Sequence, residues 1–485
     1  MSSLTRLNRT LVSRPKLPIK ILQFGEGNFL RAFANWIIQQ MNMQLDYQAG
    51  VAVVQPIPQG TVSLLKEQEG LYTLYLRGYE QGEAKSQYEV IDCIQESINP
   101  YQEKEAFLAQ AQNPDLTLIL SNTTEAGITY DTADTFQHFL EGSFPAKLTR
   151  FLFERYQYFE RAEGAGCIFL PCELINFNGD KLKECLVKYA ALWNLEPGFL
   201  DWLEGANTFC NTLVDRIVPG YPKDRMKEVR EELGYEDQLV SEGEWFHLWV
   251  IEGPPIVREV FPADKIGLNV LFTDDMQPYR TRKVRILNGA HTSTVPVGYL
   301  YGLESVRESV EHDVVGSFIQ QTLFSEIIPT LDLPSEELKA FAQDVLDRFR
   351  NPFVHHRLIS ISLNSISKFK TRCLPSLLTY VEQEGQLPKN LSFSLASLLY
   401  FYRGEKEGQP IPLKDTPAVL EYFTQEWTAV ENGNQDLETF VEKVLSQEAF
   451  WGQSLLSIPE LTATIKDHLI QLQAKGMKNY LPEIL

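Results

Sequence analysis

The sequence predicts an α/β protein with a doubly wound N-terminal domain and a second, mainly α-helical C-terminal domain. Up to about residue 275, apolar runs of strand length alternate with amphipathic helical segments, and from residue 279 onward long helical periodicity dominates. Because 485 residues exceed what one hydrophobic core usually supports, we expect two domains, residues 1–280 and 281–485.

The chain opens with a β-α-β unit. Residues 19–25 (IKILQFG) form a short apolar run that ends in glycine, and residues 28–44 repeat apolar side chains at helical spacing. Residues 50–57 (GVAVVQPI) then predict a buried strand closed by prolines. This order of elements is typical of a Rossmann-like domain with a mostly parallel sheet.

Further strands and helices follow in order. Residues 72–79 and 88–94 predict an antiparallel hairpin around Gln81 and Gly82, as an insertion or an extension of the sheet. The N-terminal domain continues with strands at 116–120, 167–170, 246–251 and 268–272 and a helix at 145–159. The C-terminal domain has helical periodicity at 284–301, 314–330, 336–348, 355–370, 391–402 and 417–431.

Composition excludes several classes of partner. The formal charge of -20 repels nucleic acid and anionic membrane surfaces, so we expect neither as a partner. No apolar run approaches the roughly 18 residues of a membrane helix. The six cysteines form no C-x-x-C pair, which indicates buried free thiols and a cytoplasmic protein.

A glycine motif lies between the first strand and the first helix. Gly25 and Gly27 allow a tight turn and a close approach of the backbone to a dinucleotide pyrophosphate. The third glycine position is Leu30, so an ordinary βα turn is the alternative. The acid that usually ends the second strand is replaced by Gln55, which leaves the choice between NAD and NADP weakly indicated. The candidate cofactor residues here are Phe24, Gly25, Glu26, Gly27, Asn28, Phe29, Leu30, Arg31 and Gln55.

A second polar segment, Ser121-Asn122-Thr123-Thr124-Glu125, follows the strand at 116–120. Open α/β sheets bind ligands at the carboxyl ends of their strands, so Ser121, Asn122 and Thr123 are candidates for the nicotinamide pocket. The same letters also fit the capped start of a helix, with Glu125 in its first turn. The sequence favours neither interpretation.

A third motif, Lys283-x4-Asn288-x2-His291, opens the helical domain. On an α-helix His291 lies about 80° and Asn288 about 140° from Lys283, and the rise to His291 is about 12 Å. Hydride transfer to a carbonyl requires a proton donor, and burial beside Arg282 and Arg285 would suit Lys283 to that task by lowering its pKa. A solvated basic turn and a packed histidine are the alternative.

Together these motifs resemble the polyol-specific long-chain dehydrogenases, the mannitol dehydrogenase family. The resemblance rests on Lys-x4-Asn-x2-His, on the early G-x-G-x-F-x-R, and on Val214-Asp215-Arg216-Ile217, and it covers nearly the whole chain. It implies an NAD-dependent oxidoreductase without a metal, with Lys283 as general acid and base. Asn288 and His291 would then position the reacting oxygen, and Asp215 would contact the substrate.

One departure from the family pattern concerns the substrate. Mannitol dehydrogenases carry a substrate-binding asparagine after Cys-Asp, whereas this chain reads Pro171-Cys172-Glu173-Leu174. The departure and the neighbouring motifs favour a member that acts on a sugar acid, a hexuronate or aldonate. A fructuronate reductase or a mannitol dehydrogenase is the alternative within the family, and a non-catalytic nucleotide-binding protein is the alternative outside it.

A sugar acid needs a cation for its carboxylate. Basic groups concentrate between Arg348 and Arg372, and the candidates for substrate binding there are Arg350, His355, His356 and Lys368. A solvated basic helix is the alternative. The adjacent histidines also suggest a metal, but no Cys or carboxylate falls beside them at ligand spacing, so we expect no metal site.

Overall fold

The computed structural model describes residues 4–13, 16–80, 82–124 and 126–485. The chain forms two compact units: Met1–Gly78 with Lys85–Met276, and Tyr79–Ala84 with Gln277–Leu485. The change of unit after Met276 falls just before the boundary at residue 280 that the sequence predicts.

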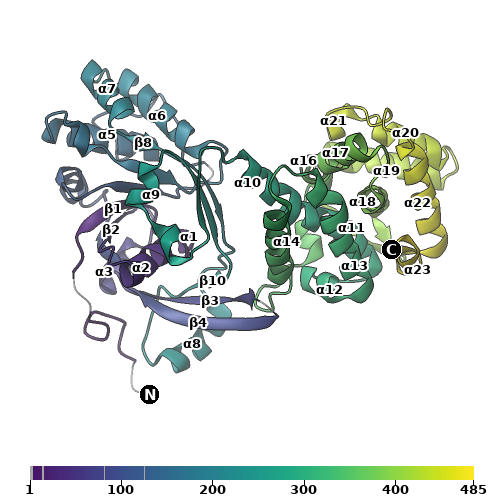
Figure 1. Cartoon of the computed structure of the whole chain (residues 1–485), viewed down its shortest axis with the longest axis horizontal. Helices are drawn as coiled ribbons and strands as arrows, with labels where there is room; N and C mark the ends of the chain where they lie inside the picture. The colour runs from purple at the N-terminus through teal and green to yellow at the C-terminus, as the bar shows by residue number, and fades with distance from the viewer. Residues whose placement is uncertain (1–3, 14–15, 81, 125) are drawn as a thin grey trace. The chain divides into compact units, whose positions relative to one another are not determined.

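A six-stranded parallel sheet forms the centre of the N-terminal unit (Figure 1). Its strands lie in the order β5-β2-β1-β6-β7-β8, and every neighbouring pair is parallel. This is the strand order 3-2-1-4-5-6 of doubly wound dinucleotide-binding folds, so the predicted fold class is confirmed. The strands are β1 Ile19–Phe24, β2 Gly50–Val54, β5 Ile94–Ile98, β6 Leu118–Ser121, β7 Ile168–Pro171 and β8 Thr208–Phe209.

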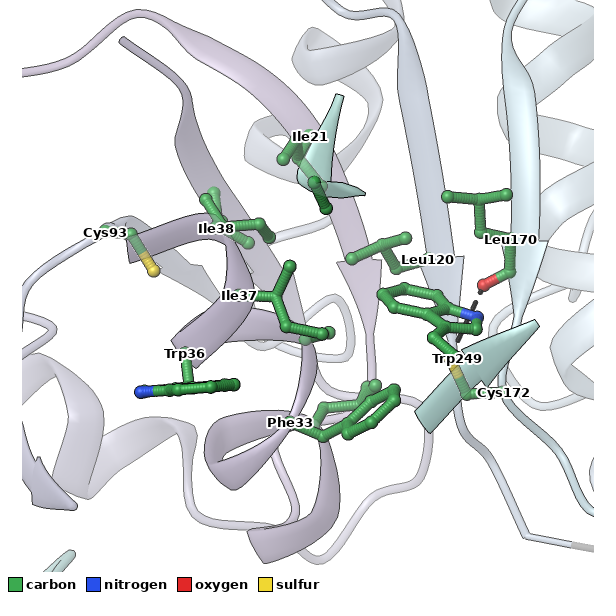
Figure 2. Packing of buried hydrophobic residues seen from close by; sticks show 14 of the residues in the cluster. Ile21, Phe33, Trp36, Ile37, Ile38, Cys93, Leu120, Leu170, Cys172 and Trp249 are labelled. Atoms are coloured by element: carbon green, nitrogen blue, oxygen red, sulfur yellow. Dashed lines mark hydrogen bonds between the residues drawn. The ribbon is translucent and has the colours of Figure 1, made fainter. Parts of the chain in front are cut away.

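Both faces of this sheet are buried, because alternate residues of its strands enter two different cores. Ile21 and Leu120 belong to the core that holds α2, whereas Leu22 and Ile119 belong to the core that holds α5 and α6. Figure 2 shows the first core, with Phe33 and Ile37 gathered near Trp249. The helices of this unit are α1 Asn28–Ala32, α2 Ala34–Gln44, α3 Val62–Glu67, α4 Lys104–Ala109, α5 Phe144–Tyr158, α6 Asn178–Leu192, α7 Pro197–Gly205, α8 Met226–Leu233 and α9 Ile256–Val260.

The first helix is broken, where the sequence predicts one helix over residues 28–44. Phe33 adopts φ -125° and ψ -80°, which separates α1 from α2. Side chains from other segments donate hydrogen bonds to the carbonyl groups that the break leaves without a helical partner. The Tyr72 hydroxyl donates to the Arg31 carbonyl at 2.7 Å, and the Arg216 guanidinium donates to the Ala32 carbonyl at 2.6 Å. Such long-range partners leave no local signal in the sequence.

The predicted hairpin is present, but it does not extend the parallel sheet. β3 Tyr72–Glu80 and β4 Glu83–Ile91 are neighbours in a separate sheet with β10 Ser241–Glu244. The strand predicted at 88–94 is therefore wrong at its end, since β4 stops at Ile91 and β5 joins the parallel sheet. The strands predicted at 246–251 and 268–272 form a third sheet, made of β9 Asn211–Asp215, β11 Leu248–Glu252 and β12 Val270–Thr273.

The segment after β6 is a loop, so the prediction of a capped helix start at Ser121–Thr124 is wrong; Glu125 lies outside the described residues. The next helix is α5, and its N-cap is Ser143, whose hydroxyl accepts from the N–H of Ala146. The described residues 122–124 and 126–143 contain no helix or strand, and an irregular segment of this length is unusual and is typical of a binding loop.

From Gln277 onward the second unit is helical, as predicted, and the only described strands of this part are the two-residue β13 Glu405–Lys406 and β14 Gln409–Pro410. The helix predicted at 355–370 is wrong as one element, because Asn364 has a φ of 55° and separates two helices. The helical elements are α10 Gln277–Arg282, η5 Lys283–Asn288, α11 Gly289–Tyr301, α12 Val306–Glu311, α13 Asp313–Gln321, η6 Thr322–Ile327, η7 Ile328–Thr330, α14 Ser335–Phe349, α15 Leu358–Ile361, α16 Ser365–Arg372, α17 Leu374–Glu384, α18 Lys389–Phe401, α19 Pro417–Glu431, α20 Leu437–Leu445, α21 Glu448–Trp451, α22 Leu461–Lys475 and α23 Met477–Ile484. Among the described residues of either unit, no helix is long and apolar enough to cross a membrane.

Candidate functional site

The two glycines after β1 are required for different reasons. Gly25 has a φ of +118°, and a Cβ there would lie 2.9 Å from the carbonyl oxygen of Asn122, so its conformation and surroundings both demand glycine. Gly27 has an ordinary φ of -66°, and a Cβ there would meet no protein atom within 4 Å. The protein therefore leaves open space beside Gly27, at the carboxyl end of β1.

Most other side chains of this turn support the fold. Phe24 and Leu30 are core residues, and Phe29 stacks on Phe33 with ring centroids 5.1 Å apart. Arg31 is buried, and it donates to the Glu26 carbonyl at 3.1 Å, to the Asn28 side chain at 2.7 Å and to the Leu239 carbonyl. The Arg31 guanidinium is thus fully engaged inside the protein.

Glu26 behaves differently, because its carboxylate turns toward the loop after β2. The side chain accepts a hydrogen bond from the N–H of Thr61 at 3.2 Å. A Cβ on Gly60 would lie 2.1 Å from Glu26 Oε1 and 2.6 Å from Gln55 Oε1, so the two side chains meet at this glycine. Burial raises the pKa of the Glu26 carboxyl, while the Thr61 and Glu26 N–H groups and the charge of Arg31 act to lower it.

Gln55 is buried and braces the loop after β2. Its amide nitrogen donates to the carbonyl groups of Ile57 at 2.9 Å and Pro58 at 3.0 Å. Both N–H groups of this side chain are therefore used within the loop. The position that carries an acid in many dinucleotide-binding folds serves here to shape the backbone.

Two of the three polar candidates at the end of β6, Ser121 and Thr123, are linked by Glu173, whose role the sequence did not reveal. Ser121 Oγ, the N–H of Thr123 and Thr123 Oγ1 all donate to the Glu173 carboxylate at 2.9 Å, while Asn122 donates to the Cys172 carbonyl at 3.2 Å. Glu173 is 2% exposed, and burial raises its pKa. The loops that follow β6 and β7 are thereby held together at the carboxyl edge of the sheet.

A cavity of about 310 Å³ opens at the same edge. Its walls come from the loop after β2, from Tyr101, from the loop after β6 and from the start of α5. Lys147 of α5 lines it, with Nζ 5.5 Å from the centre of the Tyr101 ring. Burial lowers the pKa of Lys147 to about 8. Lys147 was not a candidate from the sequence. Its place in the site depends on the irregular loop after β6, whose path no sequence pattern predicts.

In the C-terminal unit, Lys283 begins a π-helical turn, η5, that ends at Asn288. The N–H of Gly289 donates to the carbonyl of Val284, five residues earlier, in place of the α-helical four. Hydrogen bonds between residues five apart widen the turn and reduce the rotation per residue, which brings Lys283 and Asn288 closer together around the axis than in an α-helix. The separation of about 140° expected for an α-helix therefore does not apply to this turn.

The arginines beside Lys283 are engaged with other groups. Arg282 is buried, with Nη1 2.5 Å from Glu337 Oε1, and its guanidinium lies over the rings of Tyr279 and Phe341. Arg285 donates to Ser376 Oγ at 3.4 Å. π-Turns recur at functional sites, so this turn is the natural place for the predicted acid.

His291 lies at the start of α11, one turn beyond Asn288. Its ring stacks on Phe349, and its Nε2 is buried without a hydrogen-bond partner. Burial and the charges of neighbouring basic groups lower the pKa of His291 to about 3, so the imidazole is neutral near pH 7. The basic neighbours are His356, Arg348, Arg372 and Lys368, and we call these four residues with His291 the His291 cluster.

The structure thus brings together only part of the predicted basic run. His356 and Lys368 belong to the His291 cluster, whereas Arg350 pairs with Asp347 at 3.1 Å and His355 is exposed near Glu308. Arg372, which sequence reasoning did not select, donates to Thr292 Oγ1 at 3.4 Å. Its spacing of four residues from Lys368 on one helix was the available signal.

Asp215 is buried at the end of β9, beside a structural arginine. Arg216 donates to the carbonyls of Ala32, Glu244, Phe246 and Trp245, and burial lowers its pKa to about 9. The VDRI motif therefore combines a residue that shapes the fold with a candidate substrate residue. Within the described residues, no three His, Cys, Asp or Glu side chains are grouped to hold a metal ion.

Comparison with known proteins agrees with this arrangement. The family model of the mannitol dehydrogenase Rossmann domain matches residues 19–264, and that of the mannitol dehydrogenase C-terminal domain matches residues 275–473. The chain belongs to the mannitol dehydrogenase family. Together the two models cover both units, from the first strand to α22.

Several family members are similar over their full length. Altronate oxidoreductase of Yersinia enterocolitica is 47% identical over 97% of this chain and 98% of its own. Altronate oxidoreductase of Bacillus subtilis is 47% identical over 99% of this chain and 98% of its own. That of Phocaeicola vulgatus is 45% identical over 99% of each chain.

Two solved structures share the fold. A substrate-free D-sorbitol dehydrogenase superposes with a TM-score of 0.82 at 23% identity, covering 99% of this chain and 100% of that one. The Pseudomonas fluorescens mannitol 2-dehydrogenase, solved with NAD and D-mannitol, has a TM-score of 0.64 at 22% identity, covering 99% of both chains. The likeness in fold thus extends over nearly the whole chain.

Proposed function

We propose that this chain is an NAD-dependent altronate oxidoreductase, which interconverts D-altronate with NAD and D-tagaturonate with NADH. Its relatives of that name are 45 to 47% identical over nearly the entire chain. The observation that carries the proposal is the His291 cluster, in which the His356 ring lies 5.9 Å from the His291 ring and the charges of Arg348, Arg372 and Lys368 act on the imidazole. Three cations near one buried imidazole, in a protein of net charge -20, suit a substrate with a carboxylate.

The N-terminal unit fits a dinucleotide. The backbone at Gly27 is open where a Cβ would stand, and the cavity beside Lys147 lies at the carboxyl edge of a parallel sheet, where such folds bind ligands. The glycine turn, the segment Ser121–Thr123 and the cavity walls would hold the cofactor. When bound, NADH supplies the hydride for reduction of the ketone.

The C-terminal unit supplies the proton. In the reductive direction Lys283 gives a proton to the carbonyl oxygen as the hydride reaches the carbonyl carbon, and it takes the proton back in oxidation. Asn288, brought closer to Lys283 by the π-turn, donates its amide N–H to that oxygen. His291 is neutral near pH 7 and offers a hydrogen bond from its buried Nε2 without adding a charge. No metal ion takes part in the proposed reaction.

The substrate carboxylate is assigned to the cations of the His291 cluster. Arginine binds carboxylates by charge-assisted and often bidentate hydrogen bonds, so Arg348 and Arg372 are the proposed anchors, with Lys368 and His356 beside them. Of the residues predicted from sequence, Arg350 and His355 contribute less, because they face Asp347 and Glu308. Asp215 is retained as a proposed contact to a substrate hydroxyl.

A substrate panel at fixed NADH tests the proposal. We expect D-tagaturonate to be reduced with a kcat/KM at least about tenfold above that of D-fructose, which lacks the carboxylate and therefore loses a charge-assisted hydrogen bond. Faster reduction of D-fructuronate, which keeps the carboxylate, would make the chain a fructuronate reductase. Faster reduction of fructose would make the chain a polyol dehydrogenase. Absence of turnover with every substrate, together with normal NADH binding, would make it a non-catalytic nucleotide-binding protein.

The six buried free thiols support a cytoplasmic setting for the reaction.

A further inference from the structure

The glycine turn carries an acid whose position the proposed function does not explain. In many dinucleotide-binding folds, an acidic residue at the end of the second strand accepts a hydrogen bond from the ribose 2′-hydroxyl and repels a 2′-phosphate. Here that strand ends in Gln55, whose amide N–H groups are bound to the carbonyls of Ile57 and Pro58. The end of β2 therefore offers no charge of its own to discriminate between NAD and NADP.

Glu26 brings a carboxylate to this place from another segment. Its Oε1 meets Gln55 at Gly60 and accepts from the N–H of Thr61, so the carboxylate is fixed against the loop that follows β2. Its charge also reaches Tyr101, a wall of the cavity, where it contributes to the raised pKa of the phenol. Glu26 is 8% exposed, so it is largely buried but keeps a small accessible surface at the turn.

Two cations and a second acid lie in this part of the unit. Arg31, on the same turn, donates to Asn28 and to the carbonyls of Glu26 and Leu239, and its charge acts to lower the pKa of the Glu26 carboxyl and so favours the carboxylate. Lys147 lines the cavity beside Tyr101, where its Nζ donates to the Gly142 carbonyl. Glu141, the acid that lines the cavity, has a side chain that is 81% exposed and hence largely screened by water.

We propose that Glu26 is the residue that selects NAD over NADP, supplying from the glycine turn the carboxylate that this fold usually places at the end of the second strand. This inference rests on the proposed function in one respect, the binding of a nicotinamide dinucleotide to the N-terminal unit. A carboxylate at this point accepts the ribose 2′-hydroxyl of NAD and repels the 2′-phosphate of NADP.

The test is the ratio of the dissociation constants for NADPH and NADH, measured by fluorescence titration of the full chain without any sugar substrate. We expect the wild-type protein to bind NADPH at least about a hundredfold more weakly than NADH, since close like charges repel strongly at a partly buried site. Glu26→Gln keeps the size of the side chain and an acceptor for Thr61, and it should reduce that ratio at least about tenfold. Glu105→Gln removes the same charge from an exposed position in the first turn of α4 and should leave the ratio unchanged.

Glu26→Asp provides a second variant that retains the charge but withdraws it from Gln55. It should still reject NADPH while binding NADH several-fold more weakly than wild type. Equal binding of NADH and NADPH by the wild-type chain, or an unchanged ratio in Glu26→Gln, would overturn the role of Glu26 alone. Failure of the wild-type chain to bind either dinucleotide would instead overturn the proposed function and this inference with it.

Discussion

The imidazole ring of His291 stacks on the ring of Phe349, with centroids 4.3 Å apart and planes inclined by 23°. This contact holds the ring in one orientation while its Nε2 remains buried without a partner. An unsatisfied buried polar atom is costly in a native protein, so it requires a functional explanation. A hydrogen bond to the reacting oxygen of the substrate provides one.

Substitution of His291 tests this arrangement. Loss of one positioned hydrogen-bond donor typically costs about 10²–10³-fold in turnover, so His291→Ala should reduce kcat by about that factor. Because the pKa of His291 is lowered to about 3, its ionisation should be missing from the wild-type kcat profile between pH 5 and 9. His312→Ala, at the N-cap of the neighbouring α13, is a control that should leave kcat unchanged. A wild-type ionisation near pH 6.5 that disappears in His291→Ala would contradict the neutral imidazole.

The basic residues should separate into two groups. Arg372→Ala and Lys368→Ala should raise KM for the uronate by about tenfold or more and change KM for a neutral ketose little, because only the uronate loses an ion pair. Arg350→Ala is the matched control, since Arg350 already pairs with Asp347. Steady-state kinetics of each variant with both substrates measure the two KM values. Equal effects on both substrates would show that the His291 cluster is a solvated basic surface.

Lys283 is the residue on which the proposed chemistry depends. Lys283→Met keeps much of the side-chain length but removes the proton, so kcat should fall by about 10²–10⁴-fold. NADH affinity should stay within about twofold of wild type, because the glycine turn belongs to the other unit. Lys283→Arg should not restore activity, since a guanidinium stays protonated near neutral pH. Retention of more than half of the wild-type kcat in Lys283→Met would assign the lysine a structural role.

The open space at Gly27 predicts a binding defect without a folding defect. Gly27→Val should weaken NADH binding by at least about tenfold, because the added side chain occupies the approach to the pyrophosphate. Its thermal unfolding midpoint should stay close to that of wild type. Gly164→Val, at another glycine whose Cβ would meet nothing within 4 Å, is the control and should leave both quantities unchanged. If Gly27→Val binds NADH with the same dissociation constant as wild type, the pyrophosphate does not bind at this turn.

His247 should make the N-terminal unit sensitive to acid. Burial and the charge of Arg216 lower its pKa from 6.5 to about 3, and its Nε2 accepts from the N–H of Asn269 at 3.0 Å. The unfolded chain therefore binds the proton more readily, and stability is lost as the pH falls from about 6.5 toward 3. At pH 5 this group should cost at most about 2 kcal/mol, which urea unfolding at pH 7 and pH 5 measures. His247→Asn should lose less stability over that interval than wild type, and equal losses would contradict the assignment.

Local patterns predicted much of the fold. Alternating buried strands and amphipathic helices gave the doubly wound sheet, and the long helical segments gave the second unit, because hydrophobic periodicity is written in consecutive residues. The strand–glycine–helix order located the turn at Gly25 and Gly27 in the same way. Where a remote side chain replaced a local hydrogen bond, the pattern failed. The helix break at Phe33 is the example, because Tyr72 and Arg216 donate to the carbonyl groups of the two residues before it.

The sequence by itself therefore determined the two-part architecture, the position of the glycine turn and the candidate set Lys283, Asn288 and His291. Only the tertiary structure decided which basic residues surround His291, that a π-turn brings Lys283 and Asn288 closer together, and that Glu26 lies against Gln55. The physical reason is the range of the interactions. Periodicity and turn chemistry act within a few residues, whereas a charge cluster or a buried carboxylate depends on segments that meet only after the chain has packed.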